Sequence, residues 1–438
     1  MKRFIIPSLW FPLPFLASVA LAAKGLGISP FLVALILILF LFSLTRTRAF
    51  LRRGASAGRP SEDRAPQTPF SDEEVRSLAH ALQPLFAVKG WKAVGPVLQF
   101  EGSLRCSPSA ALQDINGAIA SHKLRAFLTE GERDLVRLTL VPVGREGSTA
   151  KAPNWWVHAL LFLLTLATTT WAGALHQGVN LLEEPGWFVV GLPYSIGLLL
   201  ILGAHELGHY FAARRHGIQV TPPYFVPAPF ALGTFGAFIR MRGPAPDRRA
   251  LFDMAVAGPF AGLAVAIPAL LFGLGRSQIM ITEAGPAWTH AGVEIGSSVL
   301  MALLAKLALG PAASAGRLLS LHPLAFAGWL GLLVTALNLL PIGQLDGGHI
   351  AHALWGLRRS HTISRMALFA LFVLALLVWP ALTTWALIVF FLAGSRDAPA
   401  TDDVTPLDPV RQALGYFAFV LLALILIPVP QGLYESPF

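Results

Sequence analysis

Long apolar runs recur along the sequence, and they constrain the fold more than any other feature. A helix that crosses the hydrocarbon core of a bilayer needs about 20 predominantly apolar residues. Apolar runs of about this length or longer cover residues 4–23, 30–46, 154–176, 190–212, 250–274, 321–341, 364–394 and 413–429. The run at 364–394, which is broken near Pro380, is long enough for two short spans. The sequence therefore predicts a polytopic α-helical membrane protein with a small soluble part.

Composition agrees with a membrane protein and excludes other classes. Only 13% of the residues are charged, against about 25% in a typical soluble domain. The formal net charge of +9 is spread over the ends of the apolar runs, which argues against nucleic-acid binding and is typical of the cytoplasmic ends of membrane spans. Cys106 is the only cysteine, so an intrachain disulfide is excluded.

Three regions are expected along the chain. Residues 1–53 predict an N-terminal transmembrane hairpin, residues 54–153 a small cytoplasmic α+β domain behind a polar linker, and residues 154–438 a multi-span core. The first run has an alternative, because two basic residues precede an apolar stretch that ends in Ala20-Leu21-Ala22, as in a cleaved signal peptide. We favour an uncleaved span.

The soluble region mixes helical and strand periods. Residues 71–87 carry leucines at helical spacing, and residues 108–121 predict a second helix with Ser107 as its cap. Strands are predicted at residues 96–104, 123–129 and 135–142. Acidic side chains of this region, such as Asp114 and Glu130, form no catalytic pattern and are expected to be solvated.

Basic residues mark one side of the membrane. They gather before the soluble region, between the runs at 190–212 and 250–274, and before the run at 364–394, whereas the loops near 177–186 and 275–320 carry few. Alternating crossings place all the basic loops, and the soluble region with them, on the cytoplasmic side.

Residues 205–209 read His-Glu-Leu-Gly-His, which is the HExxH pattern. On a helix, side chains four positions apart share a face, so His205 and His209 can direct imidazole nitrogens at one ion while Glu206 accepts a proton from water there. Ionisable residues within a span are costly and by default mark function. We therefore predict a metal site inside the bilayer that water reaches from the cytoplasmic side.

A catalytic zinc ion usually takes three protein ligands, so a third is expected at the same depth but far along the chain. Asp346 follows an apolar run and lies an even number of crossings from the first motif. His349 is the alternative third ligand, but we favour a structural role for it, or a hydrogen bond to one of the ligands. His216 and His352 lie beside basic loops and are expected to be solvated.

The helix is expected to break around Asp346. Non-helical backbone at membrane depth is tolerated where it is buried in protein or lines a cavity. The residues expected to break it are Pro341, Gly343, Gly347 and Gly348.

Together these motifs resemble the paired signature of site-2 proteases, the M50 metallopeptidases. The resemblance rests on His205-Glu206-Leu207-Gly208-His209 and Leu345-Asp346-Gly347, and on the intervening Tyr224-Phe225-Val226-Pro227, Gly233-Thr234-Phe235-Gly236-Ala237-Phe238 and Ala257-Gly258-Pro259. It covers roughly residues 150–430 and, more loosely, 70–150. With a small domain before the core, the sequence is most similar to the EGY-type proteins of plastids and their bacterial relatives.

The resemblance implies one zinc ion (Zn2+) per chain, bound by His205, His209 and Asp346, with Glu206 as the catalytic base. It also implies that Asn338, expected in the same helix as the aspartate, lies near bound substrate.

The segment 219–242 holds four prolines and then a glycine-containing apolar run. We interpret it as a hairpin or re-entrant loop whose edge pairs with an extended substrate, as in strand addition. Its candidate substrate-binding residues are Gly233, Phe235 and Gly236. The alternative is an ordinary interfacial loop.

The sequence thus predicts an intramembrane zinc metalloprotease that acts on transmembrane protein substrates within the lipid bilayer, without nucleic acid; the oligomeric state stays open. No transit peptide is evident, which favours a bacterial plasma membrane over a plastid membrane. Two alternatives remain: a multi-span transporter, which broken helices suit, and an inactive scaffold with a structural zinc ion, against which the intact Glu206 argues.

Overall fold

The computed structural model describes residues 70–94, 96–132, 135–142, 154–229, 232–281, 287–290, 293–295, 298–310, 317–377, 386–387, 389–390 and 399–427. The hairpin predicted at residues 1–53 therefore lies outside the described residues, and the three-region division stays a prediction. Two compact units are present. The larger contains the described residues of Thr68–Pro341, Leu345–Ser364 and Asp397–Phe438, and the smaller those of Ile342–Gln344 and Arg365–Arg396.

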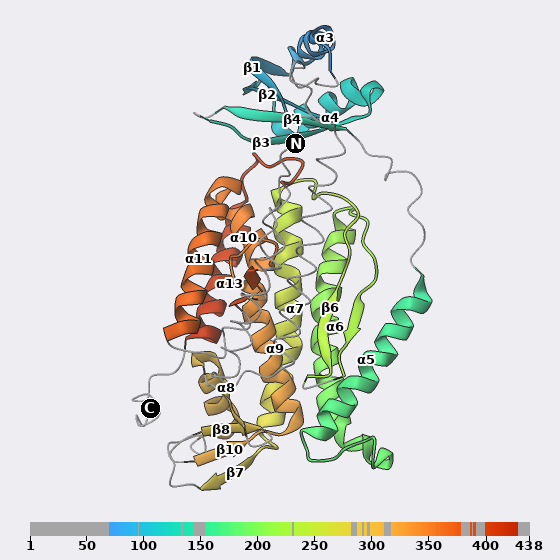
Figure 1. Cartoon of the computed structure of the whole chain (residues 1–438). Coiled ribbons are helices and arrows are strands. Elements are labelled where there is room, and N and C mark those ends of the chain that lie inside the picture. Colours follow the sequence, from blue (N-terminus) through green and yellow to red (C-terminus); the bar gives the residue numbers. More distant parts are fainter. Residues whose placement is uncertain are drawn as a thin grey trace, which may run out of the picture. The chain divides into compact units, whose positions relative to one another are not determined.

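The elements follow one another along the chain as labelled in Figure 1. They are α3 (Asp72–Leu82), β1 (Phe86–Val94), β2 (Val97–Leu104), α4 (Pro108–Ile119), η2 (Ala120–His122), β3 (Leu124–Glu130), β4 (Val136–Pro142), α5 (Trp155–Leu175), η4 (Pro185–Trp187), α6 (Phe188–Arg215), β5 (Tyr224–Pro227), β6 (Thr234–Phe238), α7 (Arg248–Leu274), β7 (Gln278–Ile281), β8 (Ala287–His290), β9 (Val293–Ile295), α8 (Val299–Leu309), β10 (Arg317–Ser320), α9 (Pro323–Leu339), α10 (Asp346–Trp355), α11 (Leu357–Leu377) and α13 (Pro409–Leu426).

Residues 70–142 fold as an antiparallel sheet in the order β1-β2-β4-β3, covered on one face by α3 and α4. Alternate strand residues such as Phe100 and Leu138 are buried against the helices, as expected for a sheet with one solvated face. The helix predicted over residues 71–87 ends at Leu82, and the strand β1 that follows was not predicted. Ser107 occupies the N-cap of α4 but its side chain makes no capping hydrogen bond.

Within the described residues, four helical segments are long and apolar enough to cross a membrane. They are Trp155–Leu175, Pro185–Arg215, Arg248–Leu274 and Pro409–Leu426. Each coincides with a predicted run. The run at 321–341 forms α9, which has 17 residues and is shorter than the usual span of about 20.

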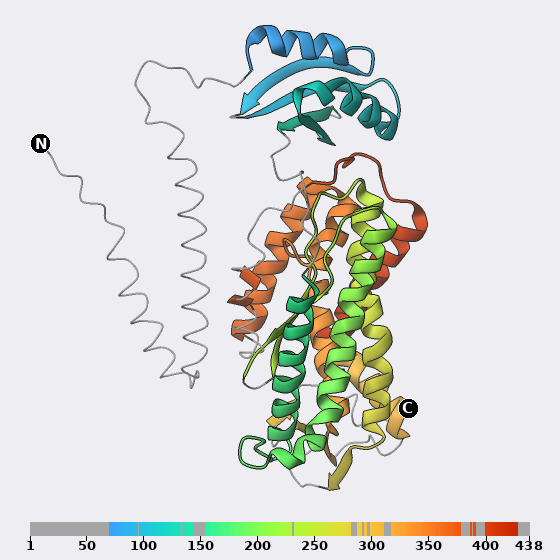
Figure 2. The ribbon, with the colours of Figure 1, turned by 90° about the vertical axis from the view of Figure 1, so that its right-hand side faces the viewer.

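The long helices pack through small residues. A Cβ on Gly208 would overlap the Ala257 carbonyl oxygen, and one on Gly328 would lie 2.7 Å from the Leu270 backbone nitrogen. Helices α5, α6 and α7 accordingly lie side by side (Figures 1 and 2). In a bilayer, where lipid tails are as apolar as leucine, such close contact supplies much of the force between helices.

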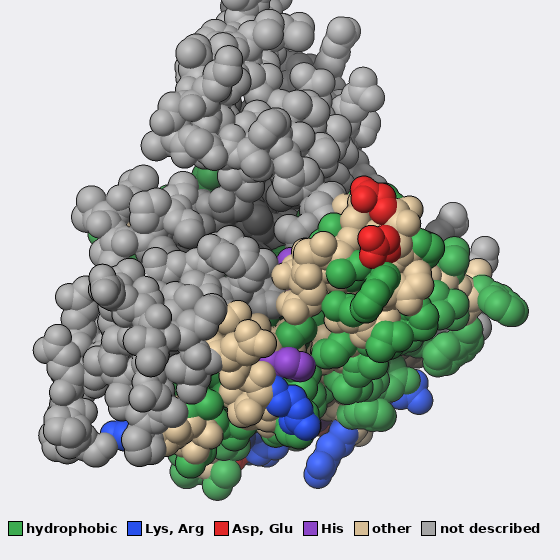
Figure 3. All heavy atoms as spheres, turned by 90° about the horizontal axis from the view of Figure 1, so that it is seen from below, with side chains coloured by type: hydrophobic (Ala, Val, Ile, Leu, Met, Phe, Trp, Pro, Cys, Tyr) green, Lys and Arg blue, Asp and Glu red, His purple; other side chains and the backbone are tan. Residues whose placement is uncertain are grey.

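Large hydrophobic side chains point outward from these helices. Trp156 on α5 is 84% exposed and Phe211 on α6 is 64% exposed. Seen from below, hydrophobic side chains cover much of the described surface, with scattered charged groups between them (Figure 3). An apolar surface of this extent suits contact with lipid rather than water.

The segment 275–320 was predicted to be a loop, but it contains four strands and helix α8 among the described residues. Its strands form a sheet in the order β7-β10-β8-β9, in which β10 pairs parallel with β8 and antiparallel with β7. Helix α8 lies between β9 and β10 in the chain and contacts α7.

The approach of α9 to α7 predicts a specific sensitivity. Gly328→Ala should lower the free energy of unfolding by about 1–3 kcal/mol, because the added methyl group meets the backbone of Leu270 and forces the helices apart. Thermal denaturation of the detergent-solubilised protein would measure this.

Gly203→Ala is the matched control, since the nearest atom to its added Cβ belongs to the Phe225 ring at 3.7 Å. Equal unfolding midpoints for the two variants would contradict the packing argument.

Candidate active site

Helix α6 carries the HExxH motif about two to three turns before its C-terminus. The helix ends at Arg215, and Gly217, two residues further on, has a φ of +71° that suits glycine. The N–H of Gly217 donates to the Arg214 carbonyl and that of Ile218 to the Ala213 carbonyl, which is the Schellman arrangement. Arg214 and Arg215 lie in the last turn, where their positive charges interact favourably with the negative end of the helix dipole. The end of the helix, and so the depth of the motif below it, is fixed locally.

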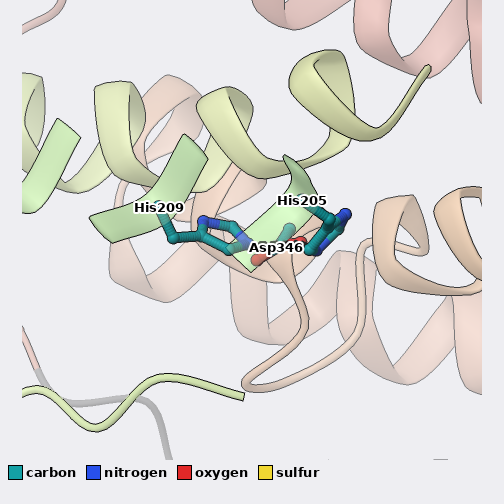
Figure 4. Close-up of side chains that lie close together, drawn as sticks. All are labelled: His205, His209 and Asp346. Carbon is teal, nitrogen blue, oxygen red and sulfur yellow. Dashed lines mark hydrogen bonds and ion pairs between the residues drawn. The ribbon is translucent and has the colours of Figure 1, made fainter. Parts of the chain in front are cut away.

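Two histidines and one aspartate from distant parts of the chain converge at this point. The Nε2 atoms of His205 and His209 lie 3.1 Å apart. Each lies 3.4 Å from Oδ2 of Asp346. Figure 4 shows both imidazole rings directed toward the carboxylate from the same helix. Among the described residues, these three form the group able to bind a metal ion.

The donor atoms fit a tetrahedral zinc ion. Ligand atoms at about 2.0–2.1 Å from zinc in a tetrahedron are separated by about 3.3–3.4 Å, close to the three distances observed. Two imidazole nitrogens and one carboxylate oxygen also make the ligand set of catalytic zinc sites, which leave one position for water. His205, His209 and Asp346 are therefore the residues that would bind the ion.

The ring of His209 is fixed from α7. Its Nδ1 donates to the Met254 carbonyl at 2.7 Å, so that Nε2 is left to present its lone pair to a metal. Gly258, one turn further along α7, lies against the same ring, and a Cβ there would overlap it. The hydrogen bond and the absent methyl group together set the orientation of the ligand.

Asp346 is placed by a break between two helices. Helix α9 ends at Leu339, Gly343 adopts a φ of +50°, and α10 begins at Asp346 itself. The prediction that Gly347 and Gly348 break the helix is wrong. Both are buried in the first turn of α10. A Cβ on Gly347 would overlap the Leu339 carbonyl oxygen, so glycine is needed for close approach rather than for a break.

Glu206 lies beside the convergent ligands and is buried. The backbone amide of Ile239, the residue after β6, faces its carboxylate. An acceptor beside a metal site is positioned to take a proton from water.

The remaining candidate residues divide into two groups. Asn338 on α9 lies at the ligands, its Nδ2 being 3.3 Å from Nε2 of His205. Gly233, Phe235 and Gly236 lie on the β5–β6 hairpin, where Gly233 and Gly236 have φ of +78° and +100°. His349 is not part of the metal-binding group found among the described residues.

Several residues that organise the site were not predicted. The Met254 carbonyl and the Ile239 amide are backbone groups that leave no mark in a sequence. Gly258 was noted only within a small-residue motif. His352 was expected to be solvated, but its side chain is fully buried and lies 2.9 Å from Asp403.

Comparison with known proteins finds a matching family and related chains. Residues 193–379 match Peptidase family M50. The chain is 31% identical over 344 residues to "Probable zinc metalloprotease EGY2, chloroplastic" of Arabidopsis thaliana, covering 76% of this chain and 60% of that protein. It is also 31% identical over 380 residues to "Probable zinc metalloprotease EGY1, chloroplastic" of the same plant, covering 78% and 68%.

The chain thus spans between 60% and 68% of the length of these two relatives. No solved structure matches it significantly.

The contact between Gly258 and His209 predicts a metal-binding defect. Gly258→Ala should weaken zinc binding roughly tenfold or more, because the added methyl group displaces the imidazole that the Met254 carbonyl orients. Competition with a chromophoric chelator would measure the affinity.

The control residue, Gly275, is the C-cap of the same helix. Gly275→Ala meets its nearest neighbour at 3.7 Å and should bind zinc as the unsubstituted chain does. Wild-type affinity in Gly258→Ala would refute the role given to this glycine.

Proposed function

Because the chain belongs to peptidase family M50, we propose that it is an intramembrane zinc metalloprotease that hydrolyses peptide bonds of membrane-spanning proteins. The observation that carries the proposal is the convergence of His205, His209 and Asp346 beside a buried Glu206, within a bundle of membrane-crossing helices. Charged groups at membrane depth are costly and are found where function requires them. A structural zinc site needs no such additional carboxylate.

A zinc ion bound by the three ligands would supply a Lewis acid that polarises the scissile carbonyl and makes water nucleophilic near neutral pH. The chain's own residues then have distinct tasks. Glu206 accepts the proton of the attacking water and returns it to the leaving amine. The Ile239 amide faces that carboxylate. Asn338, beside His205, is placed to donate a hydrogen bond to bound substrate.

The substrate must present an extended backbone. A transmembrane helix hides its peptide groups in internal hydrogen bonds, so it has to unwind locally before attack. The β5–β6 hairpin supplies a template, since the sheet has only these two strands among the described residues. Strand β6 leads directly to Ile239 and hence to Glu206. A substrate strand added to β6 lies beside the catalytic base.

The hairpin is held rigid from two sides. The Thr234 hydroxyl donates to the Val226 carbonyl at 2.8 Å and accepts from the Gly236 amide at 2.9 Å. The Thr168 hydroxyl of α5 donates to the Gly233 carbonyl at 2.7 Å. A rigid edge reduces the entropy lost when a strand pairs with it.

Charge supports a site that opens toward the cytoplasmic side of a bacterial plasma membrane, with a plastid membrane as the alternative. Arg214 and Arg215 end the helix that carries the motif, and Arg358 and Arg359 begin α11 after the helix that carries Asp346. Excess positive charge marks cytoplasmic ends. Arg248 does not add to this argument, because it is buried and paired.

The proposed catalytic base gives the sharpest test. Glu206→Gln should abolish cleavage of a co-expressed single-span substrate, since the amide cannot accept the proton, while zinc content stays near one ion per chain. Fragment lengths from mass spectrometry and metal analysis of the purified protein provide the two readouts.

Unchanged fragments from Glu206→Gln would instead support an inactive scaffold. The same variant traps bound substrate for identification. If Glu206→Gln lost zinc as well as cleavage activity, the result would refute the assignment of Glu206 as a base that does not bind the metal.

Strand addition makes a second prediction. Thr234→Val keeps the side-chain shape but removes the hydroxyl that braces the hairpin. A hydrogen bond contributes about 1 kcal/mol, so KM should rise roughly fivefold while kcat and zinc content change little.

Thr362→Val is the control, because Thr362 is an exposed helical residue whose hydroxyl bonds only within its own helix at 3.5 Å. A KM for Thr234→Val that equals that of Thr362→Val would argue for an ordinary interfacial loop.

A further inference from the structure

A second buried cluster of charged and polar side chains lies away from the metal ligands. Asp403, which is 1% exposed, receives hydrogen bonds at one carboxylate oxygen, Oδ1. Nε of Arg248 and Nε2 of His352 each lie 2.9 Å from this oxygen. The other side of Arg248 reaches Glu130, with Nη2 2.6 Å from Oε1. We call these four residues the junction cluster.

The backbone around Asp403 is bonded on two sides. The Leu128 amide on β3 donates to the Thr401 carbonyl, and the Asp403 amide donates to the Leu128 carbonyl, both at 2.9 Å. On the other side, the Thr401 amide donates to the Ala245 carbonyl at 2.8 Å. Residues 401–403 are thus bridged to β3 of the α+β region on one side and to the residues that lead into α7 on the other.

The two helices held by Asp403 are the helices that place the ligands. Arg248 is the first residue of α7, which also carries Met254 and Gly258 against His209. His352 lies on α10, six residues after Asp346 at the start of the same helix. Asp403 therefore fixes the position of α7, which orients His209, relative to α10, which carries Asp346.

Energetics argue that this arrangement is kept for its geometry. Burying an ion pair costs several kcal/mol, and replacing such a pair with apolar residues is often neutral or stabilising. The second oxygen of Asp403, Oδ2, is buried with no hydrogen-bond partner among the described residues, which adds to the cost. The junction cluster therefore contributes little to the free energy of folding, but its hydrogen bonds still set the relative direction of α7 and α10.

We propose that Asp403 is a positioning residue for the active site. Through His352 it holds α10 so that the Asp346 carboxylate meets the two imidazoles, and through Arg248 it holds α7 in the matching position. Because residues 401–403 also pair with β3, docking of the α+β region is part of the same arrangement. The inference rests on the metal site of the proposed function.

Zinc affinity of the full-length protein in detergent tests the inference, with kcat and KM as further readouts. Asp403→Ala should weaken zinc binding at least tenfold and lower kcat while leaving KM nearly unchanged, since substrate contacts the hairpin and not this cluster. His352→Leu should behave in the same way. His352→Gln, which keeps a donor near the position of Nε2, should restore affinity to within threefold of wild type.

Asp408→Asn is the matched control. Asp408 forms an ion pair with Arg411 three residues further on and caps α13, so its substitution weakens an ion pair without changing any residue of the junction cluster. This variant should bind zinc within twofold of wild type. Should the alanine and leucine variants fail to fold, Asp403→Asn and Arg248→Lys decide, with an expected loss of threefold or more.

Asp346→Ala separates the two proposals. If it loses zinc while every Asp403, Arg248 and His352 variant binds as the wild type does, the positioning role is overturned and the metal site stands. If Asp346→Ala keeps wild-type zinc affinity, the metal site itself is wrong. Equal effects of Asp408→Asn and Asp403→Ala would reduce the junction cluster to a general contribution to stability.

Discussion

The close approach of α7 to α6 is the constraint on which the metal site depends. Gly208 within the motif allows contact with the Ala257 carbonyl, and Gly258 leaves room for the His209 ring. At that separation the Met254 carbonyl reaches Nδ1 of the same ring. A larger residue at either glycine would separate the helices and remove both the hydrogen bond and the steric limit on the imidazole. The geometry of one ligand therefore follows from backbone packing in a neighbouring helix.

The bilayer imposes a second requirement, which is that polar groups find partners inside the protein. On α5, Thr165 and Thr169 donate to carbonyls one turn earlier, and the Thr169 hydroxyl also lies 2.6 Å from that of Ser195 on α6. These bonds join the two helices without exposing a polar atom to lipid. His205, His209 and Asp346 instead gather lone pairs and negative charge at one point, an arrangement that suits a bound cation.

Local motifs were predictable and distant pairings were not. His205, Glu206 and His209 follow from the helical repeat, and Asp346 follows from the count of crossings between two apolar runs. Strand β1 escaped because its register shifts between Val88 and Gly90, which disturbs the alternation that marks a strand. The junction cluster escaped because Arg248 and Asp403 are 155 residues apart. A buried histidine beside a basic loop looks solvated until its partner is known.

Helix α10 shows why the second cluster matters to the first. It has ten residues, and isolated helices of this length are not stable in water. Two glycines in its first turn weaken it further, by up to about 1 kcal/mol each. Its order must come from contacts at both ends: Gly347 against the Leu339 carbonyl at the start and His352 on Asp403 near the end. One contact fixes the position of Asp346 and the other fixes the direction of the helix, so a change at residues 401–403 reaches Asp346 through this short helix.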